Sequence, residues 1–403
     1  MSQALQPSIP YEGAASAEAT NGARRPVVLQ VLPALETGGV ERGAVDVAVA
    51  IAAAGWTSLV ASSGGHMVAE LDRGGAEHIT LGLDSKSPFA LRRNAAVLER
   101  IIRERGVDII HGRSRGPAWS ALLAGRRTGI RFVTTYHGTY NAQNFLKRRY
   151  NSVMAKGEKV IAISDFIAGH INERYNVVDG QLVTIPRGID VDVFDPARTS
   201  AERIIQLATA WRLPDGMPVI MLPGRITRWK GQGVLIDALA GLGRTDIRCL
   251  LVGSSLGREG YRDELQRTIA GHGLSGIVHI VDNCRDMPAA HMLADVVVSA
   301  STDPEAFGRV AAEAQAMGRP VVATDHGGAR ETVLPGKTGW LVPPGDPVAL
   351  TAALNEALAL DSGAREAMAR HARKHVCENF TVRAMCERTL DVYRQVLSAG
   401  PAR

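Results

Sequence analysis

The chain has 403 residues, of which 45% are hydrophobic and 22% charged, a composition that excludes collagen-like, disulfide-scaffold and wholly disordered proteins. Its 46 lysine and arginine residues against 41 aspartate and glutamate residues give a formal charge of +5. This charge favours a polyanionic or membrane-surface partner without identifying one. Only four cysteines are present, too few and too scattered for a disulfide framework or a zinc site, so we expect a reducing compartment.

We expect neither a secretory signal nor a membrane span. The first residues lack a basic start followed by an apolar core. The best apolar run, residues 44–54, contains Asp46 and is too short to cross a bilayer. The expected location is therefore cytoplasmic, with any membrane contact peripheral and on the inner face of the cytoplasmic membrane.

Short β-branched segments alternate with amphipathic segments from residue 26 onward. The expected strands of the first half span residues 27–35, 57–63, 107–114, 131–138 and 159–164. The expected helices between them span residues 42–54, 89–105 and 142–156. This alternation predicts βαβ units around a parallel sheet.

The same pattern restarts after a proline-containing stretch, residues 186–218, which holds one expected helix over 201–211. The expected strands of the second half span residues 218–224, 248–253, 277–282, 295–301 and 320–325. From residue 347 onward the pattern predicts helices alone. The fold class is therefore α/β, with two tandem Rossmann-like, doubly wound domains.

The predicted organisation has four parts: a disordered leader over 1–25, a first domain over 26–195, a second domain over 196–380, and a terminal helical segment over 381–403 that packs back on the first domain. Parallel sheets bind ligands beyond the carboxyl ends of their strands. We therefore expect the site in a cleft where the two sets of strand ends face each other.

A pair of glycines, Gly38 and Gly39, follows the first expected strand and leads into a helix. Glycines allow close approach of the backbone, and a helix N-terminus presents free N–H groups to a phosphate. The segment matches neither the GxGxxG nor the Walker pattern. Phosphate contact and a plain tight turn both remain open for it.

Arg225 and Lys230 follow the first strand of the second half. Arginine presents a rigid fork of donors to phosphate oxygens, and lysine a mobile point charge. A diphosphate clamp is the favoured interpretation, and a solvated basic loop is the alternative.

Two glutamates with seven residues between them, Glu305 and Glu313, follow the strand expected over 295–301. Glu305 precedes an alanine-rich helix, and Glu313 lies within it among alanines that ought to pack. Carboxylates at such positions bind hydroxyl pairs well. A helix-dipole acid at 305 and a surface acid at 313 are the structural alternatives.

This arrangement resembles the retaining nucleotide-sugar glycosyltransferases of the two-Rossmann-domain (GT-B) type, in the family marked by a Glu-x7-Glu signature. The resemblance spans about residues 28–393. It is carried by the glutamate pair and by six further segments: GGVERGA at 38–44, YHGTY at 136–140, IAISDFIAGHI at 161–171, IPRGIDVDVFDP at 185–196, PGRITRWKGQ at 223–232 and GWLVPPGD at 339–346.

The resemblance implies a role for each matching position. Arg225 and Lys230 match the residues that hold the donor diphosphate, Glu305 the acid on the donor sugar, Glu313 the acid on the ribose, and His137 the histidine beside sugar and acceptor. Gly38 and Gly39 match amides that contact the diphosphate, while Phe307, Gly308, Arg309 and Val310 match a segment that lines the donor. Arg285 is a candidate for the base edge by position only. Family members often carry Asn-Gly where this chain has Arg187-Gly188, so Arg187 receives no assigned role.

The resemblance also implies front-side transfer with retention, in which the departing phosphate takes the proton of the acceptor. The only Asp-x-Asp spelling, Asp190 to Asp192, lies where this family has no metal site. We expect a metal-independent enzyme without a cofactor, whose donor is a UDP- or GDP-linked hexose and whose N-terminal domain binds the acceptor.

Residues 86–159 hold 16 lysines and arginines against 4 acids, a net charge of 16 − 4 = +12, including Arg113, Arg115, Arg126, Arg127 and the run 147–149. Basic helical faces favour anionic lipid surfaces or phosphorylated glycans. The expected acceptor is a lipid-linked or anionic saccharide such as lipopolysaccharide core, and a merely basic soluble domain is the alternative.

Four other functions compete with this one. A sugar-nucleotide epimerase or a phosphorylase could use the same fold. A nucleic-acid-binding protein would suit the charge, but the chain has no named nucleic-acid motif and few aromatic residues, so no nucleic-acid partner is expected. A dehydrogenase would need a GxGxxG segment that neither half has. The sequence does not determine the donor base, the sugar, the linkage or the oligomeric state.

Overall fold

The computed structural model describes residues 24–36, 38–140, 144–282 and 284–399, which divide into two compact units. The first unit holds the chain up to Gly188 together with the segment from Val382 onward, and the second holds Ile189–Thr381. The division after Gly188 falls seven residues before the predicted boundary at 195. Most of the predicted leader, residues 1–23, lies outside the described residues, whereas Arg24 contacts the Gly106 carbonyl and Asp108.

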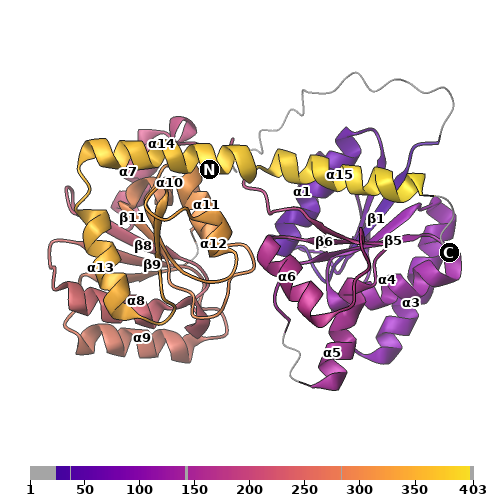
Figure 1. The fold of residues 1–403 in the computed structure, drawn as a ribbon, viewed down its shortest axis with the longest axis horizontal. Helices are drawn as coiled ribbons and strands as arrows, with labels where there is room; N and C mark the ends of the chain where they lie inside the picture. The colour runs from indigo at the N-terminus through magenta and orange to yellow at the C-terminus, as the bar shows by residue number, and fades with distance from the viewer. Residues whose placement is uncertain (1–23, 37, 141–143, 283, 400–403) are drawn as a thin grey trace. The chain divides into compact units, whose positions relative to one another are not determined.

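The first unit is built on a seven-stranded parallel sheet in the order β3-β2-β1-β4-β5-β6-β7. Its strands are β1 Val27–Val31, β2 Thr57–Ser62, β3 Glu77–Thr80, β4 Ile109–Gly112, β5 Arg131–Tyr136, β6 Lys159–Ala162 and β7 Leu182–Thr184. Its helices are α1 Gly39–Ala53, α2 Val68–Arg73, α3 Pro88–Arg105, α4 Arg115–Thr128, α5 Phe145–Asn151, α6 Asp165–Arg174 and α15 Val382–Ser398 (Figure 1).

The second unit repeats this topology with six parallel strands in the order β10-β9-β8-β11-β12-β13. Its strands are β8 Val219–Pro223, β9 Arg248–Val252, β10 Val278–Val281, β11 Val296–Ser299, β12 Val321–Thr324 and β13 Gly339–Val342. Its helices are α7 Ala201–Ala210, α8 Gln232–Leu242, α9 Glu259–Gly271, α10 Met287–Leu293, α11 Arg309–Ala316, α12 Ala329–Thr332, α13 Pro347–Leu358 and α14 Ser362–Asn379.

The two predicted parallel sheets and the α/β class are confirmed, and both sheets have the strand order of a dinucleotide-binding fold. Three edge strands were missed, β3, β7 and β13, because incomplete burial at the sheet edge weakens the apolar pattern. The helix predicted over 142–156 was too long. The structure has α5, followed by a 3-10 turn over Ser152–Ala155, and residues 141–143 lie outside the described part.

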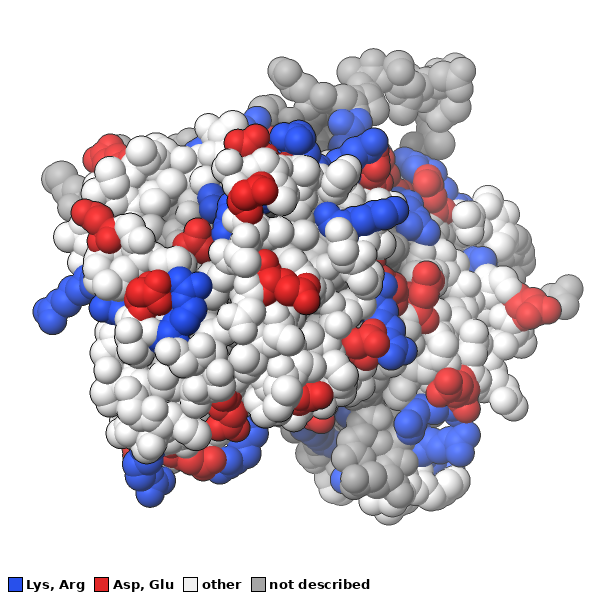
Figure 2. Space-filling view, turned by 60° about the vertical axis from the view of Figure 1, so that its left-hand side comes forward, with Lys and Arg blue, Asp and Glu red and all other residues white. Residues whose placement is uncertain are grey.

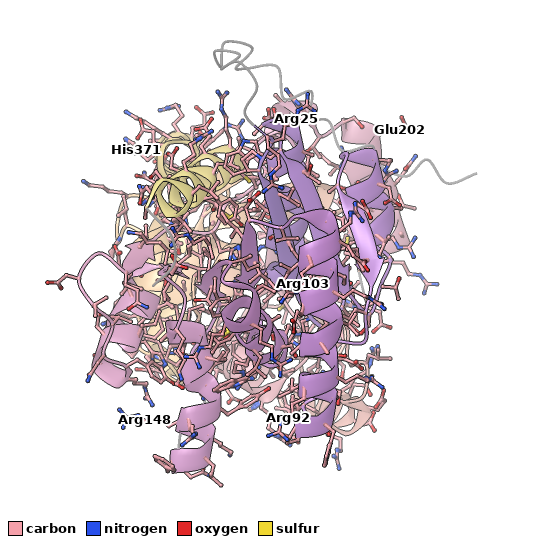
Figure 3. All side chains as sticks on the ribbon, turned by 90° about the vertical axis from the view of Figure 1, so that its right-hand side faces the viewer. Arg25, Arg92, Arg103, Arg148, Glu202 and His371 are labelled. Carbon is pink, nitrogen blue, oxygen red and sulfur yellow. The ribbon has the colours of Figure 1, made fainter. Side chains whose placement is uncertain are left out.

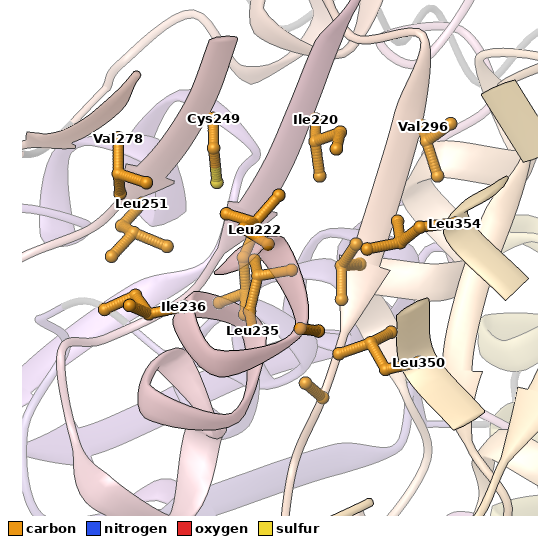
Figure 4. Close-up of a cluster of buried hydrophobic side chains, with 14 of the residues drawn as sticks. Ile220, Leu222, Leu235, Ile236, Cys249, Leu251, Val278, Val296, Leu350 and Leu354 are labelled. Carbon is orange, nitrogen blue, oxygen red and sulfur yellow. The ribbon is translucent and has the colours of Figure 1, made fainter. Parts of the chain in front are cut away.

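Helices cover both faces of the second sheet. One face packs against α8, α9 and α13, through a cluster in which Leu235, Ile236, Leu350 and Leu354 contact strand residues such as Leu222 (Figure 4). The other face packs mainly against the small side chains of α10, α11 and α12. Side-chain caps define helix starts here. Ser200 caps α7, and three aspartates cap α10, α13 and α14.

The last helix, α15, belongs to the first unit and lies beside α1 (Figure 1). Leu390 and Val396 pack with strand residues such as Val28 and Ile109 in one cluster. A buried polar chain ties the same helix to the sheet, because Tyr393 Oη lies 2.6 Å from His111 Nδ1 and Thr135 Oγ1 lies 2.8 Å from His111 Nε2. Burial and the nearby Arg113 guanidinium hold the pKa of His111 well below its usual value.

Acidic and basic side chains are interspersed over the face shown in Figure 2. No helix in the described segments has the length and apolar character needed to cross a membrane.

We predict that Leu390→Ala lowers the free energy of unfolding by about 2–5 kcal/mol, because it removes a buried side chain from the cluster that joins α15 to the first sheet. Chemical denaturation measures this loss. Arg394→Ala, on the exposed side of α15, should change stability by less than about 1 kcal/mol. Equal losses in the two variants would show that α15 contributes little through its apolar side.

Candidate active site

The candidate site of the second unit lies where β8 and β11 run side by side as neighbours in the sheet. The chain order reverses between these two strands, so the segments that follow them turn to opposite faces of the sheet at its carboxyl edge. Lys230 ends the short 3-10 turn after β8, and Glu305 lies in the loop after β11. The topology therefore brings together two residues that are 75 positions apart in the chain.

Lys230 and Glu305 form an ion pair at this edge. Lys230 Nζ contacts Glu305 Oε1, and each side chain is 15% exposed. Ser301 Oγ donates a hydrogen bond of 2.6 Å to the same carboxylate oxygen. The carboxylate is thus fixed by one cation and one hydroxyl, a charge-assisted arrangement that holds both charged groups at the sheet edge.

Backbone packing holds the two loops against each other. Gly231 has a φ of 73°, and a Cβ at this position would lie 1.9 Å from the Ala300 carbonyl oxygen, so the residue must be glycine. Thr302 N donates to the Trp229 carbonyl at 2.7 Å. These contacts place Lys230 next to the loop that carries Glu305.

Glu313 lies inside α11, where it is 9% exposed among buried alanines. Arg309 Nη2, one turn earlier, donates to Glu313 Oε1 at 2.6 Å. Both glutamates are therefore paired with a basic residue. Glu305 pairs with Lys230, which is distant in the chain, and Glu313 pairs with Arg309 of its own helix.

The segment after β12 packs against the loop between the two glutamates. Gly328 N donates to the Glu305 carbonyl at 2.8 Å. Phe307 is 3% exposed and packs edge-on against Phe380, with the ring centroids 5.4 Å apart. Phe307 thus anchors the loop in the core, as does the partly buried Val310. Gly308 ends the loop with a φ of 90° directly before α11.

Three residues that shape this site, Ser301, Gly231 and Gly328, were not predicted from the sequence. The Gly-Gly pair after the strand over 320–325 was a visible signal for Gly328, since it repeats the glycine pair after β1. Ser301 and Gly231 carried no signal of their own, because their importance comes from contacts with residues distant in the chain.

Arg225 and Arg285 are exposed, and within the described part of the chain neither guanidinium makes a hydrogen bond or ion pair. Arg225 follows β8, and its carbonyl accepts a hydrogen bond from Gln232 Nε2 at 2.9 Å. Arg225 is available to an anionic ligand at the same edge as Lys230. Arg285 lies in the segment between β10 and α10.

The remaining predicted residues belong to the first unit. Gly38 precedes α1 and Gly39 begins it, so both lie at the N-terminus of a 15-residue helix as the sequence indicated. Thr37, between the strand and these glycines, lies outside the described residues. Glu41 occupies the first turn, with its carboxylate close to Gly38. A ligand phosphate at this helix end would therefore meet one acidic neighbour.

His137 follows β5 directly, and its Nδ1 lies 3.2 Å from Arg187 Nη2. Burial, and then the Arg187 and Arg113 guanidinium groups, hold the pKa of His137 well below its usual value, so the ring is neutral. Arg113, counted above with the basic surface, is instead 3% exposed and donates to Gln30 Oε1 at 2.8 Å.

The described residues contain no group of three or more histidine, cysteine, aspartate or glutamate side chains placed to hold a metal. In the Asp-x-Asp segment, Asp190 Oδ1 accepts hydrogen bonds from the backbone of residues 192 and 193, each at 3.1 Å. Asp192 pairs with Arg198 at 3.1 Å. This segment forms a local turn.

Comparisons with known proteins agree with the fold. The family description "Glycosyl transferases group 1" matches residues 206–375, and "Glycosyltransferase Family 4" matches residues 37–193. A D-inositol 3-phosphate glycosyltransferase of Xylanimonas cellulosilytica is 32% identical over 311 residues, which cover 73% of this chain and 74% of the relative. A GDP-mannose-dependent alpha-(1-6)-phosphatidylinositol monomannoside mannosyltransferase of Mycolicibacterium smegmatis is 31% identical over 66% of this chain and 71% of the relative.

Among solved structures, a glycosyltransferase from Rickettsia africae matches with a TM-score of 0.87 and 38% identity, covering 94% of this chain and all of that one. Fold and site together define a nucleotide-sugar glycosyltransferase of the GT-B type. The chain belongs to the glycosyl transferases group 1 family.

We predict that Lys230→Met and Glu305→Gln are energetically coupled by about 1–3 kcal/mol in a double-mutant cycle, because each single change leaves the other partly buried partner without its hydrogen bond. The measurement is denaturant unfolding of the two single variants and the double variant.

The matched control is the neighbouring pair of Arg228 and Glu264, whose side chains are 69% and 41% exposed. Its coupling should be much smaller than that of Lys230 and Glu305, because solvent screens the pair. Additive effects at Lys230 and Glu305 would contradict the ion pair.

Proposed function

We propose that this glycosyltransferase moves a hexose, with retention, from a UDP- or GDP-sugar to an anionic, lipid-linked saccharide. The observation that carries the proposal is the ion pair of Lys230 and Glu305 at the carboxyl edge between β8 and β11, with Glu313 a short distance along the chain. A cation and two acids at this edge suit a diphosphate, a sugar and a ribose.

In this proposal the donor takes the place of Glu305 at Lys230. The diphosphate binds Lys230 and the available Arg225, and the released Glu305 carboxylate accepts a hydrogen bond from a sugar hydroxyl. During transfer the bond between the anomeric carbon and the phosphate oxygen breaks, the bond to the acceptor oxygen forms, and the acceptor proton passes to the leaving phosphate. Lys230 and Arg225 stabilise the negative charge that develops on that phosphate.

Metal independence is part of the proposal. Two cations at the diphosphate can supply the charge that Mg²⁺ supplies in other transferases. The local turn formed by Asp190 and Asp192 agrees with this, since both carboxylates already have partners.

Family membership favours transfer over the epimerase alternative. The Mycolicibacterium relative is named for GDP-mannose and a phosphatidylinositol mannoside, and the Xylanimonas relative for inositol 3-phosphate. Both names refer to an acceptor that carries a phosphate. These names support a phosphorylated or lipid-linked acceptor here, a class that includes lipopolysaccharide core.

The proposed membrane surface consists of α5 and the start of α3. α5 exposes Phe145 and Leu146 at 73% and 74%, followed by the exposed run of residues 147–149. Phe89, 81% exposed, lies in the first turn of α3 before Arg92 and Arg93. Arg92 and Arg148 lie at the same end of the first unit (Figure 3). Apolar tips flanked by cations suit the interface of an anionic bilayer.

Four other basic residues of this region have acidic partners. Arg103 and Arg127 pair with Glu99, Arg105 pairs with Glu77, and Arg131 pairs with Glu158. No described carboxylate pairs with the lysine and two arginines of residues 147–149.

We predict that one nucleoside diphosphate, UDP or GDP, raises the melting temperature by about 5 °C or more at a concentration far above its Kd. Glu313→Gln should weaken this binding about 10- to 100-fold, because the ribose hydroxyls lose a charged hydrogen-bond acceptor. The measurement is a thermal shift series with UDP, GDP, ADP and CMP, free and sugar-linked.

Glu366→Gln, which removes the acid of an exposed ion pair with Arg370 in α14, is the matched control and should not change the shift. With the donor so identified, transfer in EDTA should equal transfer with Mg²⁺. No stabilisation by any nucleotide would contradict the proposed function, and epimerised nucleotide sugar without acceptor would favour the epimerase.

We further predict that replacing residues 147–149 by serine weakens binding to phosphatidylglycerol vesicles about 100-fold, since each basic residue near an anionic surface contributes about 1 kcal/mol. Cosedimentation with vesicles measures this. The control replaces three exposed arginines of α15, Arg383, Arg388 and Arg394, by serine. Equal binding of both triple variants would contradict docking through α5.

A further inference from the structure

Gly43, the third glycine of the GGVERGA segment, is left without a role by the proposed donor contacts. It lies in α1 and is buried. A Cβ at this position would lie 1.8 Å from Arg187 Nη1 and 3.0 Å from Arg187 Cζ. The guanidinium of Arg187 therefore lies directly on the backbone of α1, in space that only glycine leaves open.

The same guanidinium reaches His137. Arg187 is 6% exposed, and its Nη2 lies 3.2 Å from His137 Nδ1. A guanidinium has hydrogen-bond donors only, so Nδ1 must accept and carry no proton. The proton of the neutral ring is therefore on Nε2.

His137 Nε2 is buried and has no hydrogen-bond partner among the described residues. A buried N–H without an acceptor is rare in folded proteins and is found at functional positions. It lies at the carboxyl end of β5, the edge at which this fold binds ligands. A ligand oxygen would satisfy it.

The charged and titratable groups around His137 all shift its pKa in the same direction, downward. Arg187 after β7, Arg113 after β4 and His111 within β4 all lower the pKa of His137, as burial does. Arg113 and Arg187 also line one cavity of about 10 Å³. Two arginine cations and the neutral His111 thus lie near His137.

We propose that Arg187, seated on Gly43, is a positioning residue that fixes His137 as a neutral Nε2–H donor to an oxygen of the sugar or the acceptor. The proposal rests on the proposed transferase function. It also excludes His137 as a base through Nε2, since that atom already carries the proton.

The test uses two independent variants. Arg187→Met removes the donor and the charge, while Gly43→Ala keeps both and displaces the guanidinium with a methyl group. Gly125→Ala is the matched control, because a Cβ at this buried glycine of α4 would have its nearest neighbours 3.7 Å away. The primary readout is ¹⁵N NMR of the histidine side chains, with His137 assigned by His137→Gln and folding checked by circular dichroism.

In the wild type and in Gly125→Ala, we expect the Nε2–H form of His137 throughout pH 6–8. In Arg187→Met and Gly43→Ala, we expect both neutral tautomers and a pKa raised toward the usual value, because a neighbouring cation has been lost or moved. An unchanged Nε2–H form in both variants would overturn the proposal.

The kinetic readout separates positioning from substrate contact. Both variants should lose about 10- to 100-fold in kcat at pH 8, as when the partner that orients a functional histidine is removed. Part of that loss should return as the pH falls through the raised pKa, since the imidazolium again carries a proton on Nε2. A rise in KM alone, with kcat and tautomer unchanged, would overturn the proposal in favour of direct substrate binding by Arg187. The tautomer measurement needs no turnover, so it stands even where the proposed transferase function fails.

Discussion

The site of the second unit depends on one contact between two loops, the close approach of Gly231 to the Ala300 carbonyl. Because this packing sets the loop after β8 against the loop after β11, Lys230 and Glu305 meet as an ion pair. Ser301 and the support from Gly328 then hold the carboxylate loop in place. In the proposed function, donor binding separates this ion pair, so that the diphosphate replaces the carboxylate at Lys230.

The two units share a strand order but provide opposite electrostatic environments at their carboxyl edges. In the second unit, acids and bases are paired within contact distance, as with Arg309 and Glu313. In the first unit, the carboxyl edge holds two buried arginines, Arg113 after β4 and Arg187 after β7, near the neutral His137 after β5, so hydrogen-bond donors predominate. The same topology thus carries different charged and polar groups at the two carboxyl edges.

Much of the fold was predictable because parallel-sheet strands are short, apolar and β-branched. The strands that were missed, β3, β7 and β13, lie toward the sheet edges, where incomplete burial weakens that pattern. The helix predicted over 142–156 ends as an α-helix at Asn151 and continues only as a 3-10 turn. Arg113 was misjudged as surface charge because a sequence does not show that β4 is covered by α1 and α15, which enclose its carboxyl end.

By itself, the sequence determined the α/β class, the two successive parallel sheets and the order of the motifs that follow their strands. It also determined that Glu305 precedes a helix and that Glu313 lies within it, since both follow from local pattern. Only the tertiary structure decided that Lys230 pairs with Glu305, that Gly43 makes room for Arg187, and that Arg187 meets His137. The reason is that these contacts join residues 50 to about 150 positions apart, which come together only when parallel strands align their carboxyl ends at one edge.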